Sequence, residues 1–221
     1  MPETVSEDSI VIECSSLNAR AIGEKLREIE PEASVVLRGV DGRLSGFAAG
    51  VESEFNATVA GSVGDFAFML CQEADWEVDG AAGHCCGHSL ASGRVLIRGP
   101  AADYLGAFIQ GGFIAVLGGA GNRCGYRNAG GDILIRSLVG NEAGAYMSAG
   151  DLVLANGAGE NLGHGMQGGV IYLRGDAASI APCVRHERMK DADSMRLSLL
   201  LARAGIKGDV KEFKVYRPRG N

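Results

Sequence analysis

The sequence predicts a mainly β protein in which short parallel strands stack into a β-solenoid of about seven coils. Glycine returns every 19 residues in two series, and seven short apolar windows keep the same spacing. This spacing is too short for strands joined by crossover helices and too long for tight hairpins, so each repeat is expected to make one circuit and stack its strand on the previous one. The first glycine series is Gly87, Gly106, Gly125, Gly144 and Gly163, and the second is Gly93, Gly112, Gly131, Gly150 and Gly169.

The strand windows begin at residues 56, 75, 94, 113, 132, 151 and 170. Side chains alternate between the two faces of a strand, so the second and fourth positions of each window point to the same side. Both positions are apolar in every window, which predicts that they fill the interior of the coils. The second positions are Ala57, Trp76, Val95, Ile114, Ile133, Leu152 and Ile171, and the fourth are Val59, Val78, Ile97, Val116, Ile135, Leu154 and Leu173.

A third glycine series marks another corner of each coil. Its members are Gly42, Gly61, Gly80, Gly99, Gly118 and Gly175. Ser137 and Asn156 stand at the remaining positions. Since Asn tolerates left-handed backbone better than other residues with a side chain, we interpret these positions as equivalent left-handed corners. A further inward column is interrupted by Asn128; its apolar members are Leu90, Ile109, Met147 and Met166.

Residues 1–50 read as a small α/β segment that precedes the solenoid of residues 51–180. Strands are predicted over residues 9–13 and 35–38, with a helix between them that begins at Ser15 or Ser16 and ends before Pro31. A stack of coils exposes an unpaired strand edge at each end, and this segment is expected to cap one of them.

Residues 181–221 are expected to cap the other end. A helix that begins at Asp191 or Asp193 contains five apolar residues between positions 195 and 201, and Gly205 is placed to end it. The tail, residues 211–221, carries Phe213 and Val215 among basic side chains and is expected to dock on a neighbouring chain or along the rod.

Composition limits the function classes. The net charge of −6 and the lack of a long basic run argue against a nucleic-acid partner, and no apolar stretch reaches membrane-spanning length. We therefore expect a soluble cytoplasmic protein with no membrane partner. The six cysteines form no Cys-x-x-Cys pair and are predicted to be reduced and structural.

The densest set of metal-ligand residue types is His84-Cys85-Cys86-Gly87-His88. Adjacent cysteines rarely bind one ion together. The columns are mixed: positions equivalent to Cys86 hold Leu, Cys and Ala, and positions equivalent to His88 hold Ala, Tyr and His. Packing is the favoured interpretation, with His84, Cys85 and His88 kept as candidate metal ligands.

Two other patterns are interpreted as structural. The Gly-x-Gly-x-x-Gly match at residues 163–168 precedes a strand where a dinucleotide-binding loop would open a helix. Asp132 and Asp151 could form a glycosidase pair, but we assign them to a solvated face. No catalytic or cofactor-binding residue is predicted on this chain.

The repeats resemble those of the Gly-X-Gly-X-Gly domain over roughly residues 50–180. The resemblance is carried by residues 112–118, Cys124-Gly125-Tyr126, residues 130–136, residues 143–146 and residues 168–175. That domain forms the C-terminal part of the glutamate synthase large subunit and recurs as one of the subunits of formylmethanofuran dehydrogenase. The resemblance implies a right-handed parallel β-helix that braces catalytic modules without supplying catalytic residues.

The resemblance leads to a main expectation and a first alternative, and the His84, Cys85 and His88 cluster leaves a second alternative of another class. The main one is a non-catalytic member of a glutamate-synthase-type oxidoreductase complex, similar to the free-standing subunits of N-methylglutamate synthase. A class II glutamine amidotransferase and a glutamate-synthase-like protein with FMN and iron-sulfur clusters would be the partners in a hetero-oligomer, with no cofactor on this chain. The first alternative is a scaffold subunit of a formylmethanofuran dehydrogenase or formyltransferase/hydrolase complex. The second is a stand-alone β-solenoid enzyme or metalloprotein.

Overall fold

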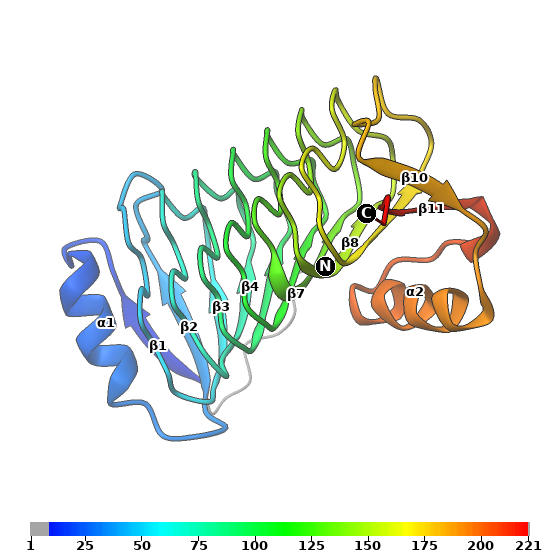
Figure 1. Ribbon diagram of the computed structural model, residues 1–221. Helices are drawn as coiled ribbons and strands as arrows, with labels where there is room; N and C mark the ends of the chain where they lie inside the picture. The colour runs from blue at the N-terminus through cyan, green and yellow to red at the C-terminus, as the bar shows by residue number, and fades with distance from the viewer. Residues whose placement is uncertain (1–8, 221) are drawn as a thin grey trace.

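The computed structural model describes residues 9–220, which form one continuous sheet and two α-helices (Figure 1). Eleven strands lie in the order β1-β2-β3-β4-β5-β6-β7-β8-β9-β11-β10. The strands are β1 Ile10–Glu13, β2 Ser34–Arg38, β3 Asn56–Val59, β4 Asp75–Val78, β5 Arg94–Ile97, β6 Phe113–Val116, β7 Ala129–Ile135, β8 Ala149–Leu154, β9 Val170–Arg174, β10 Val184–Glu187 and β11 Phe213–Pro218. The helices are α1 Ala19–Arg27 and α2 Asp191–Arg203, and Val210–Glu212 forms the short 3-10 helix η1.

The parallel solenoid and its 19-residue register are confirmed. Asn56 pairs with Asp75, Asp75 with Arg94, and the same column continues through every coil to Val170. The second and fourth positions of all seven windows are buried, as predicted. On another side of each coil a single bridge residue stacks in parallel with its equivalents from residue 63 to residue 177. Equivalent residues of successive coils therefore lie above one another, which is why the columns can be read in the sequence.

Gly93 and Gly125 show the two conditions that select glycine at the corners. Both have left-handed backbone, with φ of +80° and +68°. A Cβ on Gly93 would also lie 2.5 Å from the carbonyl oxygen of Ala74, in the coil before it. A Cβ on Gly125 would meet nothing nearer than Cδ1 of Ile133 at 3.4 Å. The predicted corners are thus of two kinds, one limited by backbone conformation and one limited also by the neighbouring coil.

The interpretation of Ser137 and Asn156 as left-handed corners is wrong. Neither residue has positive φ; Gly157 does instead, at +94°. Gly99 in the same series also has ordinary φ, and a Cβ there would lie 2.6 Å from the carbonyl oxygen of Gly80. Close approach between coils therefore selects glycine at Gly99, so tolerance of left-handed backbone does not explain Ser137 and Asn156.

Asn128 interrupts the inward column because it organises the start of β7. Its side chain is fully buried. Its Oδ1 accepts hydrogen bonds from the backbone N–H groups of Gly130 at 2.9 Å and Gly131 at 3.0 Å, and its Nδ2 donates to the carbonyl oxygen of Gly131 at 2.8 Å. The amide side chain thus satisfies backbone groups where β7 and β8 change register between Ala129 and Asp132.

Replacing Asn128 with Leu, which restores the apolar column, is expected to lower the free energy of unfolding by about 2–4 kcal/mol. Two backbone donors and one acceptor lose their partner, and those of Gly131 are buried while that of Gly130 is part-buried. Each buried group left unsatisfied costs about 1–3 kcal/mol, partly offset by apolar burial. Urea unfolding followed by the fluorescence of Trp76, the only tryptophan, measures the change. Met147→Leu, in the same column, is the control and should cost less than about 1.5 kcal/mol; a stabilised Asn128→Leu protein would contradict the assignment.

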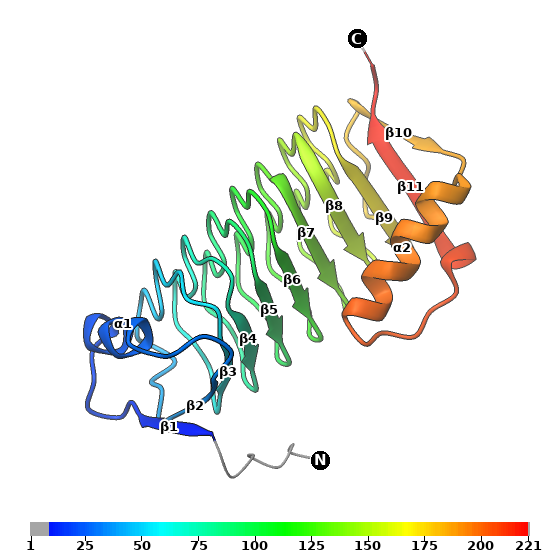
Figure 2. The ribbon, with the colours of Figure 1, turned by 90° about the horizontal axis from the view of Figure 1, so that it is seen from below.

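Helix α1 lies at the end of the row of coils beside β1 and β2 (Figures 1 and 2). Its inward residues Ile22 and Leu26 are fully buried in the main core. The predicted cap is wrong: Asn18 begins the helix, and its Oδ1 accepts a hydrogen bond from the N–H of Ala21 at 2.9 Å. The N–H of Leu17 bonds to the carbonyl oxygen of Cys14, so the chain is still turning after β1 when it passes the serines.

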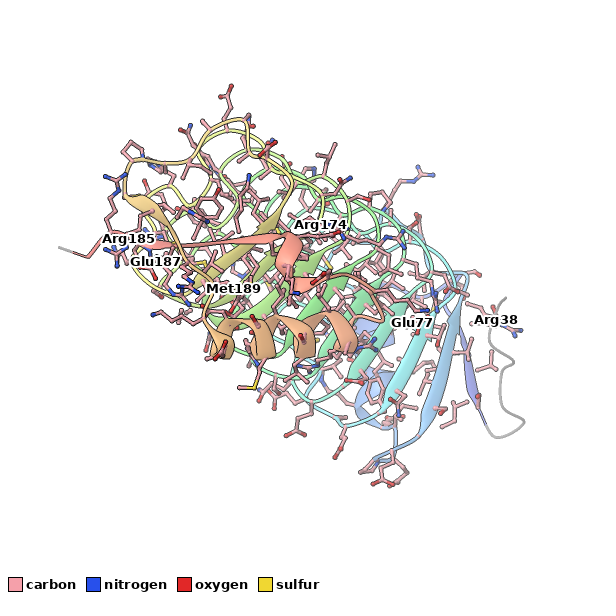
Figure 3. The ribbon with its side chains drawn as sticks, turned by 90° about the vertical axis from the view of Figure 1, so that its right-hand side faces the viewer. Arg38, Glu77, Arg174, Arg185, Glu187 and Met189 are labelled. Atoms are coloured by element: carbon pink, nitrogen blue, oxygen red, sulfur yellow. The ribbon has the colours of Figure 1, made fainter. Side chains whose placement is uncertain are left out.

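The other end of the solenoid is closed by strands. β11 pairs antiparallel with β9, and β10 pairs antiparallel with β11. The tail containing Phe213 and Val215 therefore docks on its own rod. Figure 3 shows Arg38 and Glu77 at the end away from these elements, and Arg174, Arg185 and Glu187 at the end that carries them.

Helix α2 lies across the outer face of the sheet near β8, β9 and β11 (Figure 2). Its buried leucines and strand β11 form a second core with outward side chains of the sheet. The members of this second core are Leu96, Phe113, Ala115, Leu134, Val153, Ala155, Tyr172, Leu197, Leu200, Leu201, Ala204, Phe213 and Val215. The helix ends as predicted, with Gly205 at φ +66°. Asp193 caps the first turn by accepting from the N–H of Lys190 at 2.9 Å.

An arginine joins α2 to the sheet and overturns the solvated-face interpretation of Asp132 and Asp151. Both aspartates are buried, at 8% exposure. Arg196 Nη2 lies 2.6 Å from Asp132 Oδ1, and Arg196 Nε lies 2.6 Å from Asp151 Oδ2. Burial raises the pKa of Asp132, and Arg196 partly opposes this. Because α2 covers the sheet here, the aspartates anchor the helix.

Candidate functional site

One side of the solenoid is built from six-residue turns with unusual backbone geometry. They occupy residues 45–50, 65–70, 84–89, 103–108, 122–127 and 141–146. In each turn the second, fourth and sixth residues have positive φ, as in Tyr104 at +60°, Gly106 at +60° and Phe108 at +57°. Their N–H groups bond alternately to the coils on either side: Tyr104 to Asn122, Gly106 to Cys86 and Phe108 to Tyr126. The alternation locks neighbouring turns together.

Aromatic side chains stack along this side across successive coils. The ring centroids of His88 and Phe108 lie 5.1 Å apart, those of Phe108 and Tyr126 5.6 Å, those of Tyr126 and Tyr146 5.8 Å, and those of Tyr146 and His164 5.3 Å. These five residues, together with Arg127 among them, are called the turn-face ladder below. Phe108 and Tyr146 are 39% and 40% exposed. The ladder is an ordered aromatic strip facing solvent.

Two arginines on this side differ in their partners. Arg123 donates from Nε to Glu142 Oε2 at 2.6 Å and from Nη1 to the hydroxyl of Tyr104, and these bonds raise its pKa. The guanidinium carbon of Arg127 lies 5.8 to 5.9 Å from the ring centroids of Phe108, Tyr126 and Tyr146. Among residues 9–220 no carboxylate forms an ion pair with Arg127. Arg127 is therefore a cation held by aromatic rings with its donors available.

The candidate metal ligands fall on the same side of the solenoid. His88 belongs to the ladder, its Nδ1 lies 2.9 Å from Ser89 Oγ, and burial lowers its pKa. Cys85 is half-buried with left-handed backbone, and His84 is exposed while its backbone N–H binds Asp65 Oδ1. Within residues 9–220 no group of three or more His, Cys, Asp or Glu side chains could hold a metal ion.

Purified protein is therefore expected to carry no stoichiometric metal. Elemental analysis of wild type, Cys85→Ser and His88→Ala tests this. Stoichiometric metal in wild type that is absent from both variants would contradict this expectation and support the metalloprotein alternative. His186→Ala, on β10, is the matched histidine control.

The aspartates and asparagines that begin several of the turns have a structural role. The Oδ1 atoms of Asp103, Asn122 and Asn141 each accept a hydrogen bond from the backbone N–H 19 residues later, at 2.7 to 2.8 Å. They tie successive coils together along the turn side. These residues, with Tyr104, Arg123 and Glu142, line a surface hollow beside the ladder.

Comparison with known proteins identifies the family. Residues 45–214 match the family described as "GXGXG motif". The chain belongs to the GXGXG motif family. The chain is also similar to one in the X-ray crystal structure of the formyltransferase/hydrolase complex (FhcABCD) from Methylorubrum extorquens in complex with methylofuran, at 20% identity and a TM-score of 0.68 over 91% of this chain and 86% of that one. No curated protein matches the chain.

In this GXGXG protein the ladder is the feature that sequence reasoning missed. The column 108, 127 and 146 was visible at the 19-residue spacing, but its mixture of Phe, Arg and Tyr was not interpreted as a surface. The signal that could have found it is the presence of large residues two positions after the Gly106, Gly125 and Gly144 corners. None of the helices within residues 9–220 is long and apolar enough to cross a membrane.

Proposed function

We propose that this chain is a scaffold subunit of a hetero-oligomeric formyltransferase/hydrolase-type complex, in which the catalytic residues lie on other chains. The observation that carries the proposal is the fold similarity over 91% of this chain to a chain of such a complex. Membership in the GXGXG motif family is consistent with the same role.

The structure supports a role that uses the outer surface. Inside the coils, the largest side chains, including Trp76, Phe47 and Leu105, are fully buried in the main core. Several large apolar side chains are instead exposed on separate faces, among them Phe108 on the turns and Met195 and Leu199 on α2. Exposed apolar and aromatic groups on a rigid body suit the binding of partner subunits.

The glutamate-synthase-type complex is the competing assignment. The fold similarity favours the formyltransferase/hydrolase alternative over it. The class II glutamine amidotransferase and the FMN and iron-sulfur protein expected from that assignment remain predictions, and they define the rival outcome of the experiment below.

Affinity purification of the full-length chain at native expression level tests the proposal, with mass spectrometry of both the intact assembly and its subunits. We expect formyltransferase and formyl-hydrolase subunits in fixed stoichiometry with the chain. Recovery with an amidotransferase and a flavoprotein would support the glutamate-synthase assignment and overturn ours. A chain that purifies alone would overturn both assignments.

A further inference from the structure

We propose that the turn-face ladder is the surface on which a catalytic partner subunit docks, through a partner carboxylate that pairs with Arg127 between apolar contacts to Phe108 and Tyr146. The inference rests on the proposed function and names the binding surface for it. Aromatic residues and arginine are the side chains most enriched in the energetic centres of protein interfaces.

The side chains that the ladder places on left-handed backbone are the first argument. Phe108, Arg127 and Tyr146 have φ of +57°, +53° and +57°, a conformation that disfavours residues with a Cβ by about 1–2 kcal/mol each. Gly165 occupies the next position of the same column, so glycine is accepted there. Three large side chains are kept at positions where the turn itself favours glycine, and Phe108 and Tyr146 are exposed. Every turn has this conformation at its second, fourth and sixth residues, Leu70 and Ser89 of this column included, so the strain belongs to the turns. The ladder is particular because exposed aromatic rings lie on both sides of an arginine at these positions.

Charge is the second argument. Arg123, four residues before Arg127, is neutralised by Glu142 of the next coil. Arg127 lies against three rings, which hold the guanidinium in place and leave its N–H groups without a carboxylate among residues 9–220. The chain as a whole has a net charge of −6. An acidic partner segment is therefore repelled by the protein on average and attracted at Arg127, where apolar rings lie on both sides of the cation.

The outer face of α2 offers the matched comparison. Met195 and Leu199 are 70% and 59% exposed, more than any ladder residue. They lie one helical turn apart with ordinary helical backbone. Exposed apolar side chains without a charged group do not indicate which kind of partner would bind there. The ladder differs because it combines exposed aromatic side chains with a cation that no carboxylate among residues 9–220 neutralises, and this combination suits an acidic and apolar partner segment.

The test uses the complex of the full chain with its co-purified subunits and three substitutions at one position. Arg127→Glu is expected to weaken subunit binding by about 100-fold and Arg127→Gly by about 30-fold or more, and raising salt should weaken wild type more than Arg127→Gly. Arg127→Gly should keep the wild-type thermal midpoint within about 3 °C, because relief of left-handed strain offsets the lost cation–π contact. Arg127→Lys, which keeps the charge, should lose less than Arg127→Gly. Leu199→Ser, on α2, should bind within about 2-fold of wild type.

Each outcome decides the inference. If no partner co-purifies with the wild-type chain, both the proposed function and this inference are wrong. A wild-type complex that Arg127→Glu leaves equally tight, or that Leu199→Ser disrupts instead, overturns the inference alone. A homodimer that dissociates on Arg127→Glu would assign the ladder to a second copy of the chain and overturn the partner-subunit assignment. Restored binding by Arg127→Glu when a carboxylate at the partner's interface is changed to arginine would identify the opposing residue and support the inference.

Discussion

Gly93→Ala is expected to lower the free energy of unfolding by about 3–5 kcal/mol. Alanine there would have to adopt left-handed backbone, which costs about 1–2 kcal/mol, and its Cβ would lie 2.5 Å from the carbonyl oxygen of Ala74. The contact cannot relax easily. The N–H of Arg94 bonds to that same oxygen at 3.1 Å, which fixes the distance between the two coils.

Gly125→Ala separates the two contributions. Its φ is +68°, but the nearest atom to an added Cβ is a flexible Ile133 methyl at 3.4 Å, so only the conformational cost of about 1–2 kcal/mol is expected. Urea unfolding monitored at Trp76 and by far-ultraviolet circular dichroism gives both values. If Gly93→Ala loses no more stability than Gly125→Ala, close approach between coils does not limit this corner.

The fold could be predicted because the solenoid repeats one local geometry. Each coil places the same position in the same environment, so a column of residues 19 apart reports burial directly, and the strand register at Asn56, Asp75 and Arg94 follows. The corner at Asn156 was predicted wrongly because glycine columns arise from two different causes. Left-handed backbone and close approach of a neighbouring carbonyl both select glycine, and a sequence alone does not distinguish them.

The position of α2 could have been predicted from the third residue of each strand window. The outward third position is polar in the early windows, Thr58 and Glu77, and apolar from Leu96 onward. An outward apolar column requires a cover, and α2 with β11 provides it. The ladder was harder to predict because its side chains lie on left-handed turns, where neither helical nor strand periodicity applies. Arg196 could not be paired with Asp132 and Asp151 without the position of α2.

Arg196→Met is expected to lower the free energy of unfolding at pH 7 by about 2–3 kcal/mol and to loosen α2 from the sheet. Asp132 and Asp151 are paired across β7 and β8, and their side chains are 11% and 12% exposed. Without the guanidinium, two carboxylates would face each other with only the weaker effect of the Arg203 charge to oppose their repulsion. Breaking a buried pair costs about 3–5 kcal/mol, and the 42% exposure of the Arg196 side chain reduces this because water screens the charges. Amide hydrogen exchange in α2 measures the loosening.

The pH dependence of the same variant identifies the cause. Burial and the charge of Asp151 raise the pKa of Asp132 above its usual 3.8, while Arg196 lowers it, so removing Arg196 raises this pKa further. Between 3.8 and the raised pKa the folded protein binds more protons than the unfolded chain, so the free energy of unfolding falls as pH rises through this window. Arg196→Met should therefore regain stability relative to wild type as the pH is lowered from neutral through the raised pKa of Asp132 toward 3.8. Adding Asp132→Asn should flatten this gain, because it removes the titrating group and the like-charge repulsion together. If the stability of Arg196→Met and of wild type changes with pH in parallel, the variant is destabilised by the lost packing of the arginine stem. An uncompensated carboxylate would then not be the cause.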